Sequence, residues 1–199
     1  MILPFRQVRD ADPGYALNIL LAFVEHFDRN PDDTATLADW WGLPLPLHQR
    51  LGVLGGVAAT YPEYAPKVRR GLQDAALLAA ESALPVWSAI HPDDLTLTIA
   101  LDAARAHFES PTRDGRAKVR RLARAVRDVL ASADGKAHNA ALTIYNALFI
   151  ASPADDDDLW TTHREVIRLL IGAKDAGVDM ATATARLDAL VSELNGANP

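Results

Sequence analysis

The stretch that decides the fold is KVRRGLQDAALLAAESALPVWSAI at residues 67–90, followed by HPDD at 91–94 and LTLTIALDAARAHFE at 95–109. Apolar residues in the first segment recur every three or four positions, as they do on one face of a helix. They are Val68, Leu72, Ala75, Ala76, Ala79, Ala83, Val86, Trp87 and Ile90. A surface rich in alanine lets a neighbouring helix approach closely. The pattern therefore predicts a long central helix, a short turn and a second helix.

Two prolines and two aspartates in this stretch predict where the first helix bends and ends and where the second helix begins. Pro85 removes one amide donor and crowds the preceding turn, so we expect a bend there rather than an end. Pro92 disfavours helical geometry at His91, where the first helix should end. Asp93 or Asp94 can then accept hydrogen bonds from the free amides of the next helix.

The rest of the chain repeats the helical pattern. The expected helices cover 15–27, a short segment ending at Trp40-Trp41-Gly42, 47–60, 116–132, 137–150, 159–174 and 180–194. In the first of these, the expected buried face is Leu17, Leu20, Leu21, Val24 and Phe27. We predict an all-α, single-domain multi-helix bundle of about eight helices over 1–199, with HEAT-like stacking of helix pairs as one option. Residues 1–66 would form an N-terminal helical addition and 67–195 the core bundle.

Composition narrows the function classes. An apolar fraction of 49% and a charged fraction of 23% are typical of a globular protein. A net charge of −6 disfavours nucleic-acid binding by the whole surface. The absence of cysteine excludes disulfides and thiol catalysis. The longest apolar run, 16–24, is too short to span a bilayer, and the N-terminus lacks a signal-peptide pattern. We therefore expect a cytoplasmic protein with neither a nucleic-acid nor a membrane partner.

Four consecutive aspartates, Asp155 to Asp158, admit two interpretations. They could be ligands of a hard cation, or they could form a solvated helix start that the helix dipole stabilises. We favour the helix start, because a calcium loop alternates its ligands and contains a turn glycine. No two of the six histidines have the spacing of a zinc-binding helix. The sequence therefore predicts neither a metal site nor a cofactor.

Five arginines follow one stripe of the predicted 116–132 helix and the turn before it: Arg113, Arg116, Arg120, Arg124 and Arg127. Such a stripe can bind phosphates or an acidic protein, or it can simply face solvent. No aromatic residue is interleaved with the arginines in that segment, which disfavours a nucleic-acid interface. The solvated face is the first interpretation, and an acidic protein partner is the second.

Trp40 and Trp41 form a second candidate for partner binding. Adjacent residues of a helix point about 100° apart, so both rings are hard to bury in one core. An exposed tryptophan would be a favourable anchor for a protein partner. We favour the other interpretation, in which one ring packs inward and the other packs beneath the Leu43–Pro46 connector.

A pocket between helices is the remaining option, with four candidate lining residues: Trp87, Tyr145, Trp160 and His163. No phosphate-binding loop, nucleophile elbow or other catalytic motif is present in the sequence. We therefore expect that the protein is not an enzyme. A small-molecule-binding protein or an enzyme using this pocket is the alternative function.

Segment 74–87, the turn 91–94 and segment 100–108 together resemble a group of helical immunity proteins of bacterial toxin systems. In that group an alanine-rich helix carries Leu-Pro near its end, here Leu84-Pro85, and a turn with proline and acids follows. The resemblance spans about residues 67–109. It differs at Ser82, where the family tends to have cysteine, and at residues 95–98, where the family has an arginine-bearing segment. It implies a bacterial, non-enzymatic protein that binds and neutralises a toxin.

Overall fold

The computed structural model of this chain describes residues 1–28, 35–152 and 159–196, without the side chains of 159–161. It is 82% helical, with ten α-helices in this described part and almost no strand. The predicted all-α fold class is therefore confirmed. The HEAT-like stacking of helix pairs stays a prediction.

The chain divides into two compact units. The first contains Met1–Gly71 together with Ala185–Pro199, and the second contains Leu72–Thr184. The sequence predicts an N-terminal addition of residues 1–66 alone, whereas the first unit also contains Ala185–Pro199. The prediction of a single domain over the whole chain stays a prediction.

In the first unit, a short strand pair ties down the N-terminus. The strand β1 (Ile2–Leu3) runs antiparallel to β2 (Ala35–Thr36), with Ile2 opposite Thr36 and Leu3 opposite Ala35. The helices of the unit are α1 (Phe5–Ala11), α2 (Ala16–Phe27), α3 (Leu37–Trp41) and α4 (Leu47–Thr60), followed by the 3-10 turn η1 (Pro62–Tyr64). The capping box of Thr36 and Asp39 starts α3, since each side chain accepts a hydrogen bond from the other residue's amide.

Two glycines of α4 determine how closely α1 packs against it. A Cβ atom on Gly56 would lie 3.1–3.2 Å from Val8, and one on Gly52 would lie 2.9 Å from the Cβ of Asp12. Glycines inside a helix usually weaken it. In the structure they let the two helices come into direct contact, and α4 continues through them.

The predicted buried face of α2 is wrong. Ile19 and Phe23 are the buried residues of this helix, and the Phe23 ring stacks on Trp40 with ring centroids 4.2 Å apart. Three of the residues expected inside face outward, with exposed fractions of 63% for Leu17, 57% for Leu21 and 42% for Val24. The reason is that α2 is apolar around most of its circumference, so periodicity alone does not identify the face that packs.

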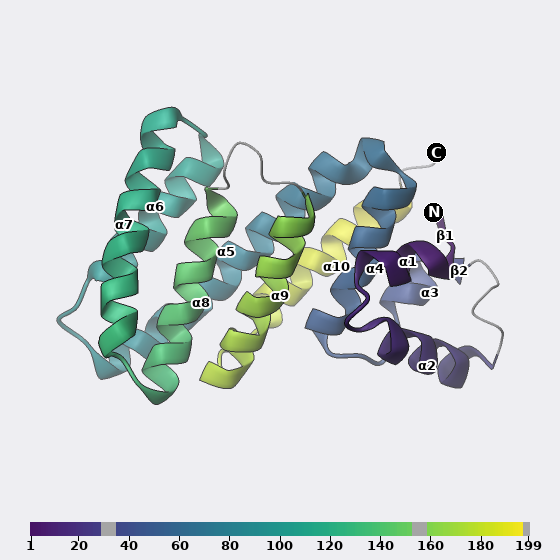
Figure 1. The fold of residues 1–199 in the computed structure, drawn as a ribbon, viewed down its shortest axis with the longest axis horizontal. Helices are drawn as coiled ribbons and strands as arrows, with labels where there is room; N and C mark the ends of the chain where they lie inside the picture. Colours follow the sequence, from purple (N-terminus) through teal and green to yellow (C-terminus); the bar gives the residue numbers. More distant parts are fainter. Residues whose placement is uncertain (29–34, 153–158, 197–199) are drawn as a thin grey trace. The chain divides into compact units, whose positions relative to one another are not determined.

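The second unit contains a row of helices (Figure 1). After the long helix α5 (Ala65–Ile90), the chain forms α6 (Thr96–Glu109), α7 (Arg113–Ser132), α8 (Gly135–Ala151) and α9 (Leu159–Ala176). The last helix, α10 (Ala181–Gly196), begins in this unit and ends in the first. Helix α6 packs on α7 and α8, α7 packs on α8, and α8 packs on α9.

The continuation of the central helix through Pro85 and its end before His91 agree with the sequence prediction, while the bend at Pro85 stays a prediction. Helix α5 continues through Pro85 and ends at Ile90, one residue before His91. The Asp94 carboxylate accepts a hydrogen bond from the Thr96 amide at 2.8 Å, and hydrogen bonding to Thr96 lowers the pKa of Asp94. Of the two aspartates predicted to start α6, Asp94 is the one that does so.

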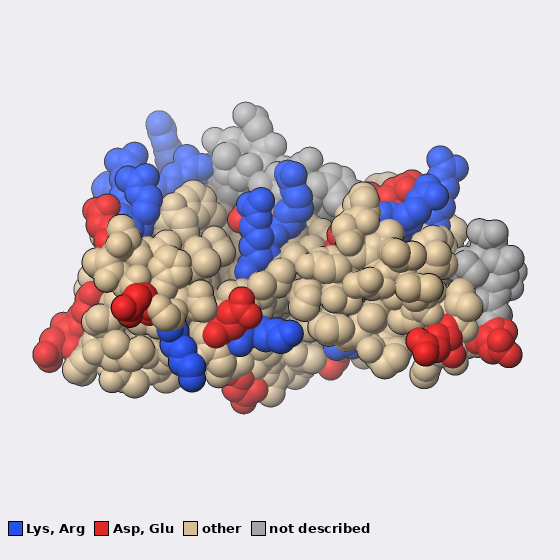
Figure 2. All heavy atoms as spheres, turned by 60° about the horizontal axis from the view of Figure 1, so that its bottom comes forward, with Lys and Arg blue, Asp and Glu red and all other residues tan. Residues whose placement is uncertain are grey.

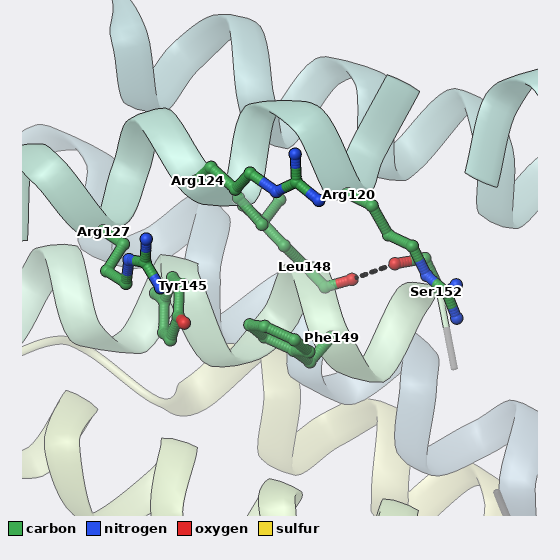
Figure 3. Close-up of a pocket in the computed structure, with 8 residues that line it drawn as sticks. Arg120, Arg124, Arg127, Tyr145, Leu148, Phe149 and Ser152 are labelled. Carbon is green, nitrogen blue, oxygen red and sulfur yellow. Dashed lines mark hydrogen bonds between the residues drawn. The ribbon is translucent and has the colours of Figure 1, made fainter. Parts of the chain in front are cut away.

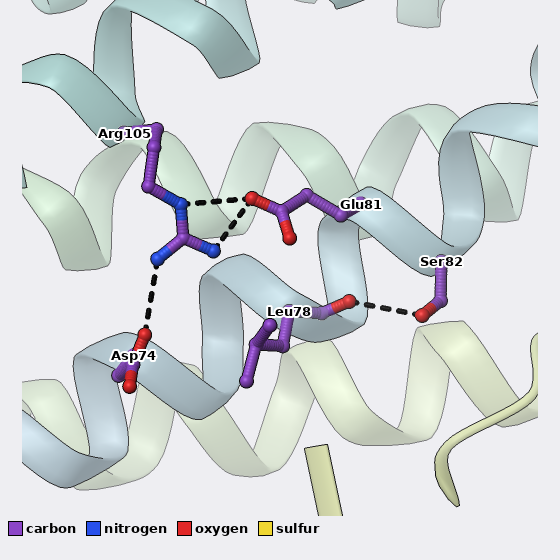
Figure 4. Close-up of polar contacts among 5 residues, drawn as sticks. All are labelled: Asp74, Leu78, Glu81, Ser82 and Arg105. Atoms are coloured by element: carbon purple, nitrogen blue, oxygen red, sulfur yellow. Dashed lines mark hydrogen bonds and ion pairs between the residues drawn. The ribbon is translucent and has the colours of Figure 1, made fainter. Parts of the chain in front are cut away.

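Arg105 joins α6 to α5 (Figure 4). Its Nε donates to Glu81 at 2.8 Å and its Nη1 donates to Asp74 at 3.0 Å. Burial by itself would lower the pKa of Arg105, but hydrogen bonds to both carboxylates outweigh burial and raise it. Its guanidinium carbon also lies 5.9 Å from the centre of the Phe108 ring. A single arginine therefore bridges two turns of α5.

We predict that Arg105→Ala lowers the free energy of unfolding by about 2 kcal/mol, since it leaves two carboxylates without their cation. The loss should be smaller than for a fully buried pair, because 23% of the Arg105 side chain is exposed. Arg168→Ala is the matched control. Arg168 pairs with Glu165 but is 69% exposed, so its loss should cost less than about 1 kcal/mol. Urea denaturation of both variants measures the difference, and equal losses would contradict the structural role of Arg105.

Candidate functional site

Helix α7 presents the predicted arginine stripe on a well-defined helix. Its N-cap residue, Thr112, accepts a hydrogen bond from the Gly115 amide at 2.9 Å. Val119, Ala123 and Val126 form its buried face. Because these residues recur at three- and four-residue steps, the arginines between them are directed away from the core.

Three of the five predicted arginines line a groove between α7 and α8 (Figure 3). The groove has a volume of about 330 Å³. Ala123, Leu148 and Ser152 are its buried residues. We call it the arginine groove, and it is lined by Arg120, Ala123, Arg124, Arg127, Tyr145, Leu148, Phe149 and Ser152. The alanine leaves space that a larger residue at position 123 would fill.

The α8 side of the arginine groove carries two aromatic rings. Tyr145 and Phe149 are one helical turn apart and meet edge to face, with ring centroids 4.9 Å apart. Phe149 is 48% exposed, which is unusual for a phenylalanine in a helix that is otherwise largely buried. Sequence reasoning found no aromatic residue among the arginines, because these rings belong to the neighbouring helix. Tyr145 was a candidate for a different pocket.

The charge of the arginine groove is positive. Among the residues that the structure describes, no ion pair involves Arg124 or Arg127. Figure 2 shows Lys and Arg side chains gathered at its left, the side on which α7 lies in Figure 1. The overall charge of the chain is −6, so this local concentration of positive charge contrasts with the rest of the protein.

Arg113 and Arg116 lie at the start of α7 and do not line the groove. Arg116 is close to His107, whose side chain is buried in α6. The Nδ1 atom of His107 accepts a hydrogen bond from the Thr112 amide at 3.3 Å. A Cβ atom on Gly115 would lie 2.9 Å from both His107 Nδ1 and Thr112 Oγ1, so this turn requires glycine. Burial, followed by the charge of Arg116, lowers the pKa of His107.

Neither Trp40 nor Trp41 is an exposed anchor for a partner. Trp40 is 0% exposed, and its indole nitrogen donates to the Leu3 carbonyl at 2.9 Å. Trp41 is 6% exposed and donates to the Asp188 carboxylate at 2.8 Å, while the Arg50 guanidinium lies 5.0 Å from its ring centre. The two rings diverge as expected, but each has its own set of neighbours.

The structure does not bring the four predicted pocket residues together around the arginine groove. Tyr145 lines it, whereas Trp87 stacks on His91 at a centroid distance of 4.1 Å. His163 is buried in α9 and is not a lining residue. The Trp160 side chain and the aspartates at 155–158 lie outside the described residues. Within the described residues, no three His, Asp or Glu side chains are placed to hold a metal ion.

In the part of the chain that the structure describes, none of the helices has the length and apolar character needed to cross a membrane. Comparison of this chain with protein-family models, with curated proteins and with solved structures finds no match.

We predict that His107 makes stability depend on pH. Because its pKa is lower in the folded protein than its ordinary value of about 6.5, the unfolded chain binds a proton first as the pH falls. The free energy of unfolding should therefore decrease from pH 7.5 to 5.5. His107→Asn can still accept a hydrogen bond from Thr112 but cannot titrate. The free energy of unfolding of this variant should decrease less steeply with falling pH. The slopes of the variant and the parent chain should differ by at most about 1.4 kcal/mol per pH unit. Parallel curves in urea titrations at each pH would refute the assignment.

Proposed function

We propose that this protein is a non-enzymatic helical protein that binds an acidic protein partner through the arginine groove. The observation that carries the proposal is the combination of Arg124 and Arg127 with the exposed Phe149 ring. Arginine and aromatic side chains are the residues most enriched at the energetic centres of protein interfaces. Arginines also form paired hydrogen bonds with carboxylates, which gives the contact a defined geometry.

The groove dimensions favour an anchor side chain from the partner. A volume of about 330 Å³ is at the lower end of the range for small-molecule sites, about 300–1,000 Å³. It has room for a bulky apolar side chain against Tyr145 and Phe149. The arginines on α7 would then pair with carboxylates on either side of that anchor. Desolvation by the anchor would strengthen these charge pairs.

The chemistry of the groove supports binding rather than catalysis. Among the described residues that line it, none carries a carboxylate or an imidazole. Proton transfer by side chains usually needs such a group with a pKa near neutrality. We therefore retain the non-enzymatic assignment as part of the proposal.

A toxin is the partner that the resemblance of residues 67–109 to bacterial immunity proteins suggests. An acidic surface on such a partner would complement the positive charge of the arginine groove. The proposal includes a cytoplasmic location, which is supported by the cysteine-free composition.

We predict that the double variant Arg124→Glu/Arg127→Glu binds its partner at least about 100-fold more weakly, since it replaces two attractive charges with two repulsive ones. The partner would be captured from a lysate of the source organism, identified by mass spectrometry and purified. Its affinity for each variant would then be measured by calorimetry at low and high salt. If the partner is a toxin, co-expression of the parent chain should restore growth, and the double variant should not.

Arg121→Glu is the control. It makes the same charge reversal on the same helix, but Arg121 does not line the groove. This variant should keep its affinity within about threefold, because exposed charges outside a contact contribute little. Equal affinity of the parent chain and the double variant for every captured protein would contradict the proposal.

A further inference from the structure

The side chain of His107 connects the end of α6 to the start of α7. Its residue is 5% exposed, and its Nδ1 atom accepts a hydrogen bond from the Thr112 amide at 3.3 Å. A backbone amide can only donate, so Nδ1 carries no proton in this contact and the neutral ring has its proton on Nε2. The hydrogen bond between His107 and Thr112 therefore exists only while the ring is neutral.

Thr112 links His107 to the first turn of α7, residues 113–116. Its Oγ1 atom accepts a hydrogen bond from the Gly115 amide at 2.9 Å, and its carbonyl accepts one from the Arg116 amide at 3.0 Å. These two bonds satisfy amides at the helix start that have no partner within the helix. The residue that caps α7 is thus the same residue that is held by the His107 ring.

The Nδ1 side of the His107 ring faces positive charge. A Cβ atom on Gly115 would lie 2.9 Å from Nδ1, so the backbone of α7 covers this edge of the ring. The start of a helix is the positive end of its dipole, and Arg113 and Arg116 add two positive side chains to this turn. Burial, followed by the charge of Arg116, disfavours the protonated ring and lowers the pKa of His107.

The acids of α5, α6 and α7 do not offset this positive charge. On α5, Asp74 and Glu81 are paired with Arg105. Glu109 at the end of α6 and Asp114 in the first turn of α7 are exposed to solvent.

Helix α8, which also packs on α6, brings no charged side chain to the ring. Residues 137–151 contain no Asp, Glu, Lys or Arg. The ring of His138 lies near the Leu130 carbonyl, at 3.3 Å, and so belongs to the other end of α7. In the part of the chain that the structure describes, Arg116 is the only charge found to change the pKa of His107.

We propose that His107 is an acid-sensitive switch that opens the first turn of α7. When Nδ1 takes up a proton, it becomes a donor that faces the Thr112 amide, which is also a donor. The charged ring is then held against Arg116 and the positive end of α7. The ring leaves this position for solvent, Thr112 loses its contact with α6, and residues 110–116 detach.

The opening should end at Val119, the first residue of α7 that is fully buried. Val119, Ala123 and Val126 hold the remainder of the helix on the core, and the arginine groove lies on that remainder. The inference rests on the α6–α7 contact alone. It does not depend on the proposed binding of an acidic partner.

Amide hydrogen exchange of the full chain, followed by NMR, tests the switch. The exchange rate of the Arg116 amide, divided by its intrinsic rate at each pH, gives the opening constant of the first turn. This constant should increase at least about tenfold from pH 7.0 to pH 5.0. The increase is limited to about 30-fold, because pH 5.0 is 1.5 units below the ordinary histidine pKa of about 6.5.

Urea distinguishes local opening from global unfolding. Opening of one turn exposes little surface, so about 1 M urea should leave the exchange of the Arg116 amide unchanged. The Val126 amide, in the buried part of α7, should exchange faster in the same urea.

Two variants test the role of the charges. His107→Asn cannot titrate, so its Arg116 amide should keep the same opening constant at both pH values within about twofold. Arg116→Gln removes the repelling charge, and the acid-induced increase should be at least about twofold smaller than in the parent chain. Arg121→Gln makes the same change at an exposed position of α7 and should keep the parent increase.

Three outcomes would overturn the proposal. An opening constant of the parent chain that is equal at pH 7.0 and pH 5.0 excludes the switch. A urea dependence of the Arg116 amide equal to that of Val126 shows global unfolding instead of a local opening. A full acid-induced increase in His107→Asn assigns the effect to another group.

Discussion

Where α1 crosses α4, the Val8 backbone occupies the space that a side chain on Gly56 would need. The same constraint recurs elsewhere in the fold, because its helix contacts use small residues. The buried alanines of α5 provide such a surface in the second unit, and Ala123 provides one on α7. Close contact through small residues leaves the large side chains to project at the edges of each contact. The arginine groove is one result, since Ala123 forms its base while longer residues form its sides.

The parts of the fold that follow from local chemistry could be predicted from the sequence. The end of α5 before Pro92 and the start of α6 beside Asp94 depend on residues only a few positions apart. Helix α1 could not be predicted in this way, because three of its seven residues are charged and only Val8 and Ala11 are buried. The prediction of the packed face of α2 was wrong for the opposite reason. Because apolar residues occur on both sides of α2, only the position of Trp40 next to Phe23 selects the inner side.

The candidate site combines information that a single helix does not contain. The arginine stripe could be found on α7, since its spacing is a property of that segment. The rings of Tyr145 and Phe149 come from α8, and their position depends on how α7 packs against it. The two tryptophans illustrate the same limit. Both rings are buried, and Trp41 donates a hydrogen bond to Asp188, which is 147 positions away along the chain. Periodicity predicts the direction of a side chain but not its distant neighbours.

The discontinuous first unit has a consequence for the order of synthesis. Its residues 1–71 leave the ribosome first, yet the unit also requires the segment from Ala185 onward. Contacts such as Lys67 with Glu193 and Trp41 with Asp188 form only after almost the whole chain has been made. The second unit, which is continuous, is complete earlier. The part of the protein that is translated first is thus the last to be finished, and until then it lacks the surface that the segment from Ala185 onward provides.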